Sequence, residues 1–462
     1  MASNKKILVI LFAIAVLSGL FWNQKIFGQP ISSDQVVYDG IAQDLLTKGT
    51  YTLDGQETSA EPIYPLFLAG IYKVFGHDYN IVRIIQILLF VLTVCIVFSL
   101  ANDLIGTKLA FAAGLLVALY YPLVNQAGLL LQETLFTFLL VLLVYSLYKA
   151  QGGLDQLQFG KTGAGWLFFS GIILGLATLT KGSLQFFFVF ILAYIFYTYW
   201  PPTTFSRLKL IKVVGGFLLG FLIIVGPWVA REKFLGGGVG VAPRGGGTLL
   251  ALTEVTERMS QNYTGNLVGF LFGYYFAQKL YPEINPVAFR DTSTTKQRIE
   301  DLTKQGKSLR ELDAIFFKEA KSYIIRNPQK FAYMVVLNFI NLNSPILIKG
   351  SLWQNVTAIH PMFADGRHAD WPGLYKIVIA LGVRLVWFAL FALVIYGLWY
   401  SRKNLGKFGW ILLLVIYLNL FYSLVWAIPR YALPLYPFYF ILAVVGLSTL
   451  WRKYNRFFLV KK

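Results

Sequence analysis

The feature that most constrains this chain is a series of apolar segments, each about 16 to 25 residues long. An α-helix rises 1.5 Å per residue, so each segment can cross the roughly 30 Å hydrocarbon core of a bilayer. Of the 462 residues, 56% are hydrophobic and only 14% are charged, a balance that excludes an ordinary soluble enzyme. We therefore predict an all-α polytopic membrane protein.

The apolar segments predict ten membrane spans. They cover residues 7–22, 81–101, 109–123, 129–148, 164–180, 184–200, 212–230, 376–400, 407–428 and 433–451. The short connections rich in lysine and arginine then fall on the side of the N-terminus, which the positive-inside rule assigns to the cytoplasm. This placement accounts for basic residues behind the net charge of +19, so we expect membrane lipids and no nucleic acid as partners.

An eleventh apolar segment, 331–348, would reverse the orientation of everything after it if it crossed. It contains Asn338, Asn341 and Asn343. Their polar groups would be unsatisfied in lipid, so we expect the segment to lie in or dip into the outer leaflet. The alternative is that 267–281 also crosses, which gives twelve spans.

Two long outward loops divide the chain. The predicted parts are an N-terminal transmembrane module (1–230) with a first outer loop (23–80), a large outer loop (231–375) with the membrane-skimming segment (331–348), and the C-terminal transmembrane helices (376–462). The first outer loop has seven acidic and three basic residues, whereas residues 231–330 have fifteen basic and ten acidic residues. Opposite charge on the two loops favours an outer site for an anionic lipid and a polar co-substrate; ordinary solvated loop charge is the alternative.

Two acidic residues stand at the outer ends of predicted helices. Asp34 falls in the first turn of a helix predicted to open with a Ser32-x-x-Gln35 capping box. Glu133 lies where the fourth apolar segment begins, and an acid so near hydrocarbon is unfavourable unless it is used or paired. A fixed carboxylate at the water–lipid boundary suits a general base, although the helix dipole alone also favours an acid in a first turn.

Cations gather at the same membrane level. They are Arg83, Lys181, Arg231 and Arg430, each at the outer end of a predicted span. Together they suit a lipid phosphate through charge-assisted hydrogen bonds, while each alone also fits a snorkelling anchor. Arg384 lies roughly two turns inside its span, so we expect it to face the bundle interior or a cavity.

Two further patterns are weaker. His360, Asp365, His368 and Asp370 are metal-ligand types without a recognised ligand spacing, so we expect no required cofactor, with a divalent metal as the alternative. The glycine-rich run 236–247 lacks the spacing of a nucleotide fingerprint. We expect a flexible loop there, with a backbone nest for phosphate as the alternative.

A set of short motifs occurs in one order along nearly the whole chain. They are Asp34-Gln-x2-Tyr38, Gly49, Glu61-Pro62-x2-Pro65-Leu66, Phe75-Gly76, Arg83, Glu133, Gly175-x2-Thr178-Leu179-Thr180-Lys181-Gly182, Pro227-Trp228-x2-Arg231, Asn327-Pro328-x2-Phe331 and Arg430-Tyr431-x2-Pro434-x2-Pro437. This order resembles the lipid-carrier-dependent glycosyltransferases of the GT-C superfamily, which include the lipid A aminoarabinose transferases and the protein O-mannosyltransferases. The resemblance implies a GT-C-type bundle of about ten to twelve transmembrane helices, with amphipathic helices in the outer loops.

The same resemblance implies a function. It is the transfer of a hexose or pentose from a polyprenyl phosphate, undecaprenyl or dolichyl, to a lipid, glycan or protein acceptor at the outer face of a bacterial or archaeal plasma membrane. Asp34 is then the expected general base of an inverting transfer, with Glu133 as a second catalytic candidate. The candidates for binding the carrier phosphate are Lys181, Arg83, Arg231, Arg430 and Arg384, and Tyr431 matches a family position beside the carrier.

The chain departs from the family pattern at two positions. Gln35 stands where a second acid is frequent, and Glu61 stands where the lipid A enzymes have lysine, so we expect the carrier contacts to be distributed differently. Two other functions stay open: a transporter or flippase of a lipid-linked sugar, in which Arg384 binds the same anion, and an oligosaccharide transferase. No inverted repeat favours transport, and we expect neither the acidic metal motif nor the large outer domain usual for oligosaccharide transfer.

Overall fold

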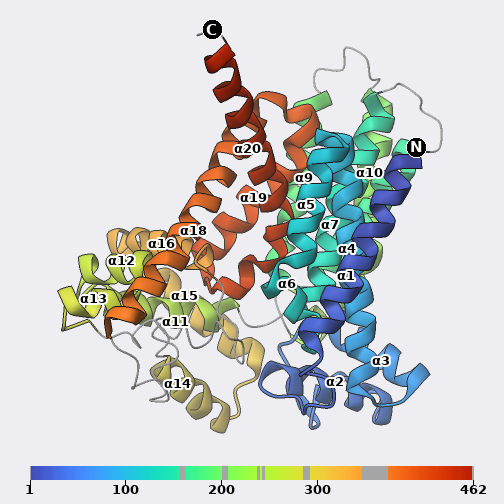
Figure 1. Cartoon of the computed structure of the whole chain (residues 1–462). Coiled ribbons are helices and arrows are strands. Elements are labelled where there is room, and N and C mark those ends of the chain that lie inside the picture. The colour runs from blue at the N-terminus through green and yellow to red at the C-terminus, as the bar shows by residue number, and fades with distance from the viewer. Residues whose placement is uncertain are drawn as a thin grey trace. The chain divides into compact units, whose positions relative to one another are not determined.

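The computed structural model describes residues 2–155, 162–199, 207–236, 240–241, 245–284, 292–345 and 373–459. The chain forms two compact units. Unit 1 comprises residues 1–242, 393–418 and 433–462, and unit 2 comprises residues 243–392 and 419–432. Figure 1 shows the elements of both units along the chain.

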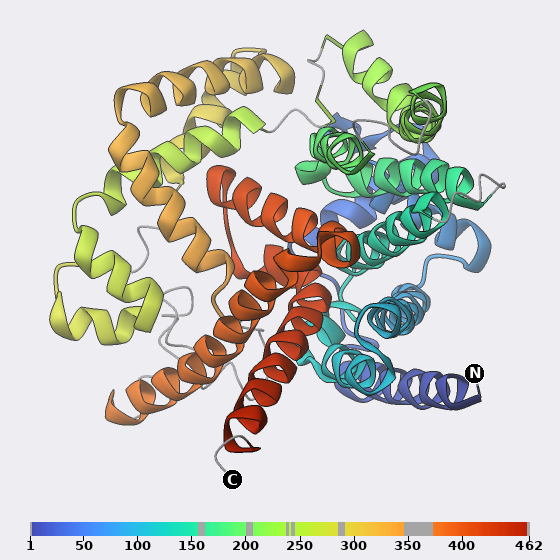
Figure 2. The ribbon, with the colours of Figure 1, turned by 90° about the horizontal axis from the view of Figure 1, so that it is seen from above.

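Unit 1 is a set of long apolar helices with a small loop region at one end. Its elements before residue 242 are α1 (Ala2–Asn23), α2 (Asp34–Thr47), β1 (Thr52–Leu53), β2 (Gln56–Glu57), α3 (Ile63–Phe75), α4 (Tyr79–Ile105), α5 (Thr107–Leu119), α6 (Tyr121–Gln126), α7 (Glu133–Asp155), α8 (Thr162–Thr180), η1 (Gly182–Leu184), α9 (Phe187–Tyr199) and α10 (Arg207–Phe234). The later elements are α18 (Gly373–Ser401), η3 (Arg402–Asn404), α19 (Leu405–Val425), η4 (Pro429–Leu435) and α20 (Tyr436–Leu459), and unit 1 takes their residues 393–418 and 433–459. Helix α1 packs on α4 and α5, α4 on α7, α7 on α8, and α8 on α10. Figure 2 views these helices from above, with the blue α1 at the edge of the set.

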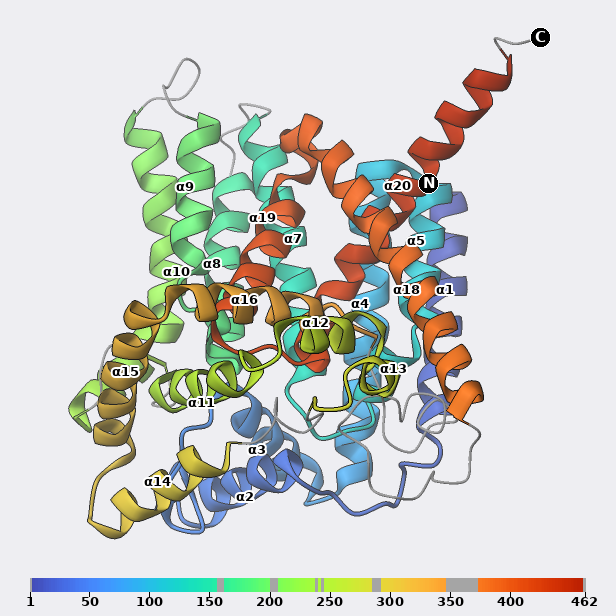
Figure 3. The ribbon, with the colours of Figure 1, turned by 90° about the vertical axis from the view of Figure 1, so that its left-hand side faces the viewer.

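Unit 2 contains shorter helices. They are α11 (Gly245–Met259), α12 (Tyr263–Phe272), α13 (Tyr274–Leu280), α14 (Ser293–Lys304), α15 (Leu309–Arg326) and α16 (Pro328–Leu342), followed by the first part of α18 and residues 419–432. One apolar cluster joins α11 to α16 through Met259, Met334 and Leu337. A second joins α11 to α15, where Phe316 is 2% exposed, and Figure 3 shows α15 running between α14 and α16.

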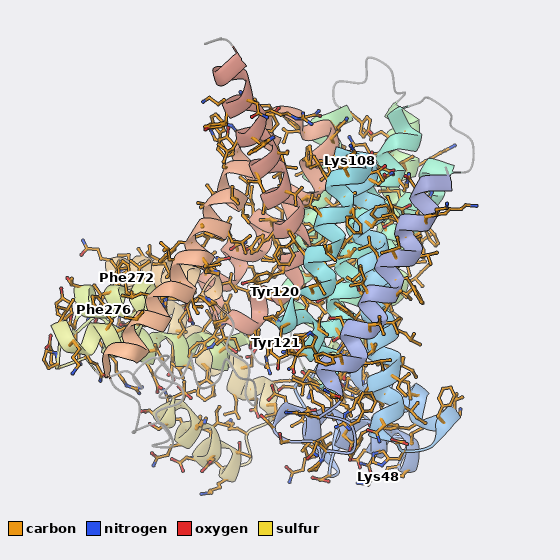
Figure 4. The ribbon with its side chains drawn as sticks, in the orientation of Figure 1. Lys48, Lys108, Tyr120, Tyr121, Phe272 and Phe276 are labelled. Carbon is orange, nitrogen blue, oxygen red and sulfur yellow. The ribbon has the colours of Figure 1, made fainter. Side chains whose placement is uncertain are left out.

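The two ends of unit 1 carry different polar contacts. At one end Lys149 pairs with Asp103 at 2.7 Å, and the amide of Gln151 donates to Gly406 O. The other end holds the first outer loop, α6 and the turn after α8. Figure 4 shows Lys108 at the first end and Lys48 and Tyr121 at the second. Lys108, Lys149 and Gly406 therefore lie at one end of unit 1 and the first outer loop at the other, the same division that the basic connections predict.

The described residues include eight stretches that are long and apolar enough to cross a membrane, as in a multi-pass membrane protein. One of them, Leu381–Val425, contains both α18 and α19. The predicted span 109–123 is not among the eight. Its helix α5 ends at Leu119 after 13 residues, and the chain turns at Tyr120 before α6 begins. The count of ten to twelve spans therefore stays a prediction.

The alternative crossing at 267–281 is wrong. Gly273, with φ of 99°, separates α12 from α13, and helices of 10 and 7 residues are too short to span a bilayer. A continuous apolar composition in the sequence therefore hid a break in the helix.

The side-chain amides of Asn338, Asn341 and Asn343 in α16 are hydrogen-bonded, whereas Oδ1 of Asn338 and Oδ1 of Asn341 have no partner among the described residues. The amides donate to groups of residues 419–427 within unit 2: Asn338 to Ser423 O, Asn341 to Ala427 O and Asn343 to Asn419 Oδ1. All three asparagines are buried. They bind α16 to α19, and α16 is too short to be one of the eight candidate spans.

Part of the glycine-rich run is helical, so our expectation of a flexible loop is wrong for residues 245–247. They form the first turn of α11, and Gly246 N donates to Asp313 Oδ1 of α15 at 2.6 Å. A Cβ atom at Gly246 would lie 2.0 Å from Asp313 O. Only glycine allows this close approach of the two helices.

Single cysteines at the two ends of unit 1 should be labelled from opposite sides of the membrane. In a Cys95→Ser background, we expect a membrane-impermeant maleimide to modify Thr52→Cys in intact cells. Asn404→Cys should react only after permeabilisation, because it lies at the end marked by the Gln151–Gly406 contact. Lys108→Cys is a second probe of that end. Labelling of both Thr52→Cys and Asn404→Cys in intact cells would contradict the arrangement.

Candidate active site

The turn between α6 and α7 leads directly to Glu133. Its backbone is held by three side chains from two other helices, Gln35 of α2 and Arg83 and Gln86 of α4, and Asn23 of α1 donates to Val124 O within α6. The shortest contact runs from Gln86 Nε2 to Leu129 O, 2.7 Å. Because backbone groups buried away from water require partners, these contacts fix the turn and so the start of α7.

Glu133 forms a buried ion pair with Lys181, which directly follows α8. The Nζ–Oε1 distance is 3.8 Å, and the two side chains are 7% and 2% exposed for Lys181 and Glu133. The ammonium group also lies 5.7 Å from the centre of the Phe136 ring. Two residues that the sequence placed only at one membrane level thus lie in contact in the structure.

Glu61 anchors the turn that carries Lys181. Its Oε1 accepts a hydrogen bond from Gly182 N at 2.9 Å, and the residue is 2% exposed. A Cβ atom at Gly182 would lie 3.3 Å from Glu61 Oε1 and 2.9 Å from Val241 Cγ2. The first outer loop therefore packs directly on the Lys181–Gly182 turn.

Arg231, at the end of α10, stacks on two aromatic rings. Its Cζ lies 4.7 Å from the ring centre of Trp228 and 5.7 Å from that of Tyr51, and its Nη1 donates to Glu232 Oε1 at 2.6 Å. Tyr51 also donates to Ala60 O, next to Glu61. The Arg231 side chain is 38% exposed, so a half-open guanidinium adjoins the loop that anchors Lys181.

Asp34 is the first residue of α2 and is partly exposed. The predicted capping box is absent: Ser33 is the N-cap, without a side-chain cap bond, and Gln35 Nε2 donates to Ser32 O. Ser33 has φ of 57°, which is uncommon for a residue other than glycine and is often found at functional sites. Because Gln35 Oε1 also accepts from Leu130 N, α2 is tied to the turn that leads to Glu133.

A second carboxylate, Asp39, fixes the middle of α2. It accepts hydrogen bonds from Gln43, Tyr72, His77 and Tyr79, and is 4% exposed. Burial, followed by the bond to Asp39, raises the pKa of the Tyr72 hydroxyl above its usual range, so Tyr72 stays a donor. Asp39 thereby fastens α2 to α3 and to the start of α4, and this holds Asp34 in place.

The other predicted residues have different surroundings. Arg83 is 1% exposed and donates to Gly128 O, Asn80 Oδ1 and Gln29 O, so its guanidinium holds loop segments together. Arg384 donates to Phe270 O and Leu271 O at the end of α12, both in unit 2. These contacts satisfy carbonyl groups of a helix end.

Arg430 and Tyr431 lie in η4, within the part of it that belongs to unit 2. The Tyr431 ring lies 5.2 Å from that of Tyr422. Arg384, Arg430 and Tyr431 therefore all belong to unit 2. His360, Asp365, His368 and Asp370 lie outside the described residues, and the described part of the chain contains no cluster of three metal-ligand side chains.

Several residues of the site were not predicted. Asp39, His77 and Tyr51 were passed over, and Trp228 appeared only within a family motif. Gln35 and Glu61 were noted as departures from a family pattern, and Gln35 also as part of a capping box. A signal existed for Asp39, since it occurs between the apolar residues Tyr38 and Ile41 on the inner side of α2, and a buried acid requires several donors. The contacts of Gln35 and Glu61 join segments 95 and 121 residues apart, which no local pattern shows.

A comparison with family models gave a match over part of the chain. A family model described as dolichyl-phosphate-mannose-protein mannosyltransferase matches residues 59–230, which include Glu61, Glu133 and Lys181. No curated protein sequence matches the chain.

Two solved structures resemble this chain to different degrees. The archaeal oligosaccharyltransferase AglB from Archaeoglobus fulgidus, in complex with an inhibitory peptide and a dolichol-phosphate, has a TM-score of 0.55 and 13% identity over 99% of this chain and 51% of that chain. The chain thus spans about half the length of AglB. ArnT from Cupriavidus metallidurans, bound to undecaprenyl phosphate, has a TM-score of 0.40 and 15% identity over 96% of this chain and 78% of that chain. The predicted all-α membrane bundle of the GT-C type is confirmed.

The Asp44 carboxylate should make the first outer loop sensitive to acid. Lys48, Gly55 N and Thr52 Oγ1 hydrogen-bond to it and lower its pKa from 3.8 to about 2. Since the pKa is lower in the folded state, the contribution to stability is complete above the unfolded value and is lost as the pH falls through about 2. We expect hydrogen–deuterium exchange in residues 50–57, expressed throughout relative to the intrinsic exchange rate at the same pH, to rise between about pH 4 and pH 2.

In Asp44→Asn, exchange in this segment should already be faster at neutral pH and should change little on acidification. Asp54→Asn is the matched control, because Asp54 lies in the same hairpin at a φ of 54° that Asn also adopts. An acid-dependent rise in exchange that persists in Asp44→Asn would show that another group controls the loop.

Proposed function

We propose that this protein is an integral-membrane glycosyltransferase that moves one sugar from a polyprenyl phosphate to an acceptor at the outer membrane face. The observation that carries this proposal is the buried Glu133–Lys181 pair, which the first outer loop anchors through Glu61. Lys181, buried beside the first outer loop, provides a cation for the leaving phosphate. Asp34 of that loop provides a carboxylate for the acceptor. The family match over residues 59–230 and the shared fold support the same chemistry.

In this mechanism Asp34 accepts the proton of the acceptor hydroxyl as its oxygen attacks the anomeric carbon. The bond from that carbon to the phosphate oxygen breaks, and the polyprenyl phosphate leaves as an anion. One displacement inverts the anomeric centre. Asp34 stands in the first turn of α2, a position where a carboxylate group is well accommodated by the helix dipole. No second acid is needed, because a phosphate is already a good leaving group once cations stabilise it.

Lys181 and Arg231 are the proposed partners of the leaving phosphate within unit 1. A phosphate oxygen would compete with Glu133 for the Lys181 ammonium, whose distance to that carboxylate exceeds hydrogen-bond length. Arg231 is held flat by Trp228 and Tyr51, and a stacked guanidinium suits a phosphate because its donors are oriented in advance. We retain Arg430 and Tyr431 as proposed carrier contacts from unit 2.

The donor is proposed to be a hexose or pentose on undecaprenyl or dolichyl phosphate, and the acceptor a lipid, glycan or protein. The expected location is the plasma membrane of a bacterium or archaeon, with the site facing outward. A transporter was expected to bind the anion through Arg384. Because Arg384 donates to the carbonyl groups that end α12, this support for transport is weaker. Transfer of a whole oligosaccharide stays the second candidate because of the shared fold with AglB.

Asp34→Asn should lower turnover by about 100-fold or more, the usual contribution of a general base, and should leave carrier binding nearly unchanged. Asn is tolerated at a helix start, so folding should persist. The assay follows release of free carrier phosphate from a panel of polyprenyl-phosphate sugars. Wild-type transfer by this variant would remove Asp34 from the mechanism.

Lys181→Ala should weaken binding of the carrier phosphate by about 1.5 to 3 kcal/mol, the range for a hydrogen bond to a charged group. Because the change leaves Glu133 buried beside no lysine, the double variant Lys181→Met with Glu133→Gln keeps the pair neutral and should show a similar loss. Lys149→Ala is the matched control, since Lys149 pairs with Asp103 at the other end of unit 1. Equal losses at Lys149 and Lys181 would indicate general anchoring in the membrane.

A further inference from the structure

A narrow pocket lies beside Glu133, between α4, α5, α6 and α7. Its polar lining consists of Thr93, Gln126, Glu133, Thr134 and Thr137, all within unit 1. The remaining walls are apolar, and the space admits a group about the size of one water molecule. Neither the family match nor the mechanism above gives this pocket a role.

Two residues that line the pocket carry a buried oxygen with no hydrogen-bond partner in the part of the chain that the structure describes. The oxygens are Gln126 Oε1 and Thr134 Oγ1, in residues that are 7% and 6% exposed. Buried polar atoms in native proteins are nearly always satisfied by protein, water or ligand. An unmatched amide oxygen and hydroxyl on two residues that line one pocket therefore indicate a polar group from outside the protein.

The lining determines which kind of group fits. The hydroxyls of Thr93 and Thr137 already donate to Leu89 O and Glu133 O, so they offer only acceptor capacity to the pocket. Gln126 Oε1 and the Glu133 carboxylate are acceptors as well. A cation is disfavoured, since the Lys181 ammonium lies 3.8 Å from Glu133 and would repel it. The best match is a small neutral donor, namely one hydroxyl group.

Such a hydroxyl can come from water or from a sugar. Glu133 lines the pocket and pairs with Lys181, the proposed partner of the donor phosphate, so a glycosyl group on that phosphate would start next to the pocket. We propose that the pocket receives one hydroxyl of the sugar being transferred and that water fills it when no donor is bound. This rests on the proposed function, and it makes Gln126 and Thr134 determinants of sugar specificity. A bulky N-acetyl group at that ring position would not fit.

The test compares binding of a bare polyprenyl phosphate with binding of the same carrier linked to mannose, glucose, galactose, xylose or N-acetylglucosamine, once with dolichyl and once with undecaprenyl carriers. In the wild type, at least one linked sugar without an N-acetyl group should bind more tightly than the bare carrier. In Gln126→Leu and Thr134→Val this advantage should fall by about tenfold, equivalent to one good hydrogen bond, with bare-carrier affinity unchanged.

Matched controls lie outside the pocket. Gln132→Leu and Thr178→Val remove the same groups from residues that are also buried, with oxygens that lack a partner among the described residues. Both controls should keep the advantage of the linked sugar. A structure of the donor-free wild-type enzyme at a resolution that shows waters should contain one between Gln126 and Thr134, and the donor should displace it.

The outcomes separate the two proposals. If the bare carrier binds but no linked sugar binds more tightly, or if the pocket variants keep the full advantage, the pocket holds water only and the inference is wrong. If neither the bare carrier nor any linked sugar binds, the proposed function itself fails.

Discussion

The structure of unit 1 depends on one constraint, that backbone groups of a non-helical turn within an apolar bundle must find partners other than water. The turn between α6 and α7 meets it with amide and guanidinium side chains from α2 and α4. Gly128 shows how tight the packing is, since a Cβ atom there would lie 2.2 Å from Oδ1 of Asn23 in α1. The same contacts that satisfy the turn also fix the residue after it, Glu133, against α2 and α4. The need to hydrogen-bond the backbone of this turn thus also fixes the position of the Glu133 carboxylate.

Charge placement then follows a simple order from buried to exposed. The Glu133–Lys181 pair lies inside, with little solvent to weaken the attraction between its members. Arg231 lies half open on two aromatic rings, and Asp34 lies partly exposed at the end of α2. A phosphate reaching Lys181 would exchange one anionic partner for another, which avoids leaving a buried lysine without a counter-charge. Asp34, the base of the proposed mechanism, lies where an acceptor molecule from water or lipid can approach its carboxylate.

The sequence predicted the membrane class, the sides of the connections and the shared level of Glu133 and Lys181, because apolar length and charge asymmetry are local properties. The sequence could not predict which groups each basic side chain contacts. Arg83 and Lys181 look alike as basic residues at span ends, yet Arg83 donates to three oxygens of the fold while Lys181 faces a carboxylate. The break at Gly273 and the amide contacts of Asn338 were hidden for a related reason. Whether a glycine ends a helix, or an amide finds a carbonyl 85 residues away, is decided by tertiary packing.

Glu61 shows how a departure from a family pattern changes the work of a site without removing it. A lysine at this position would present a cation, whereas the carboxylate accepts the Gly182 N–H and has little room to do anything else at 2% exposure. Because Gly182 directly follows Lys181, that bond sets the direction from which the lysine side chain leaves the backbone. The first outer loop therefore contributes no positive charge at Glu61. It orients the positive charge of Lys181, which directly follows α8. Glu61 fixes Lys181 through the backbone of Gly182, and Glu133 fixes it through the side chain. Because a preorganised charge in a low-dielectric site acts more strongly than a mobile one, this arrangement can replace a second cation.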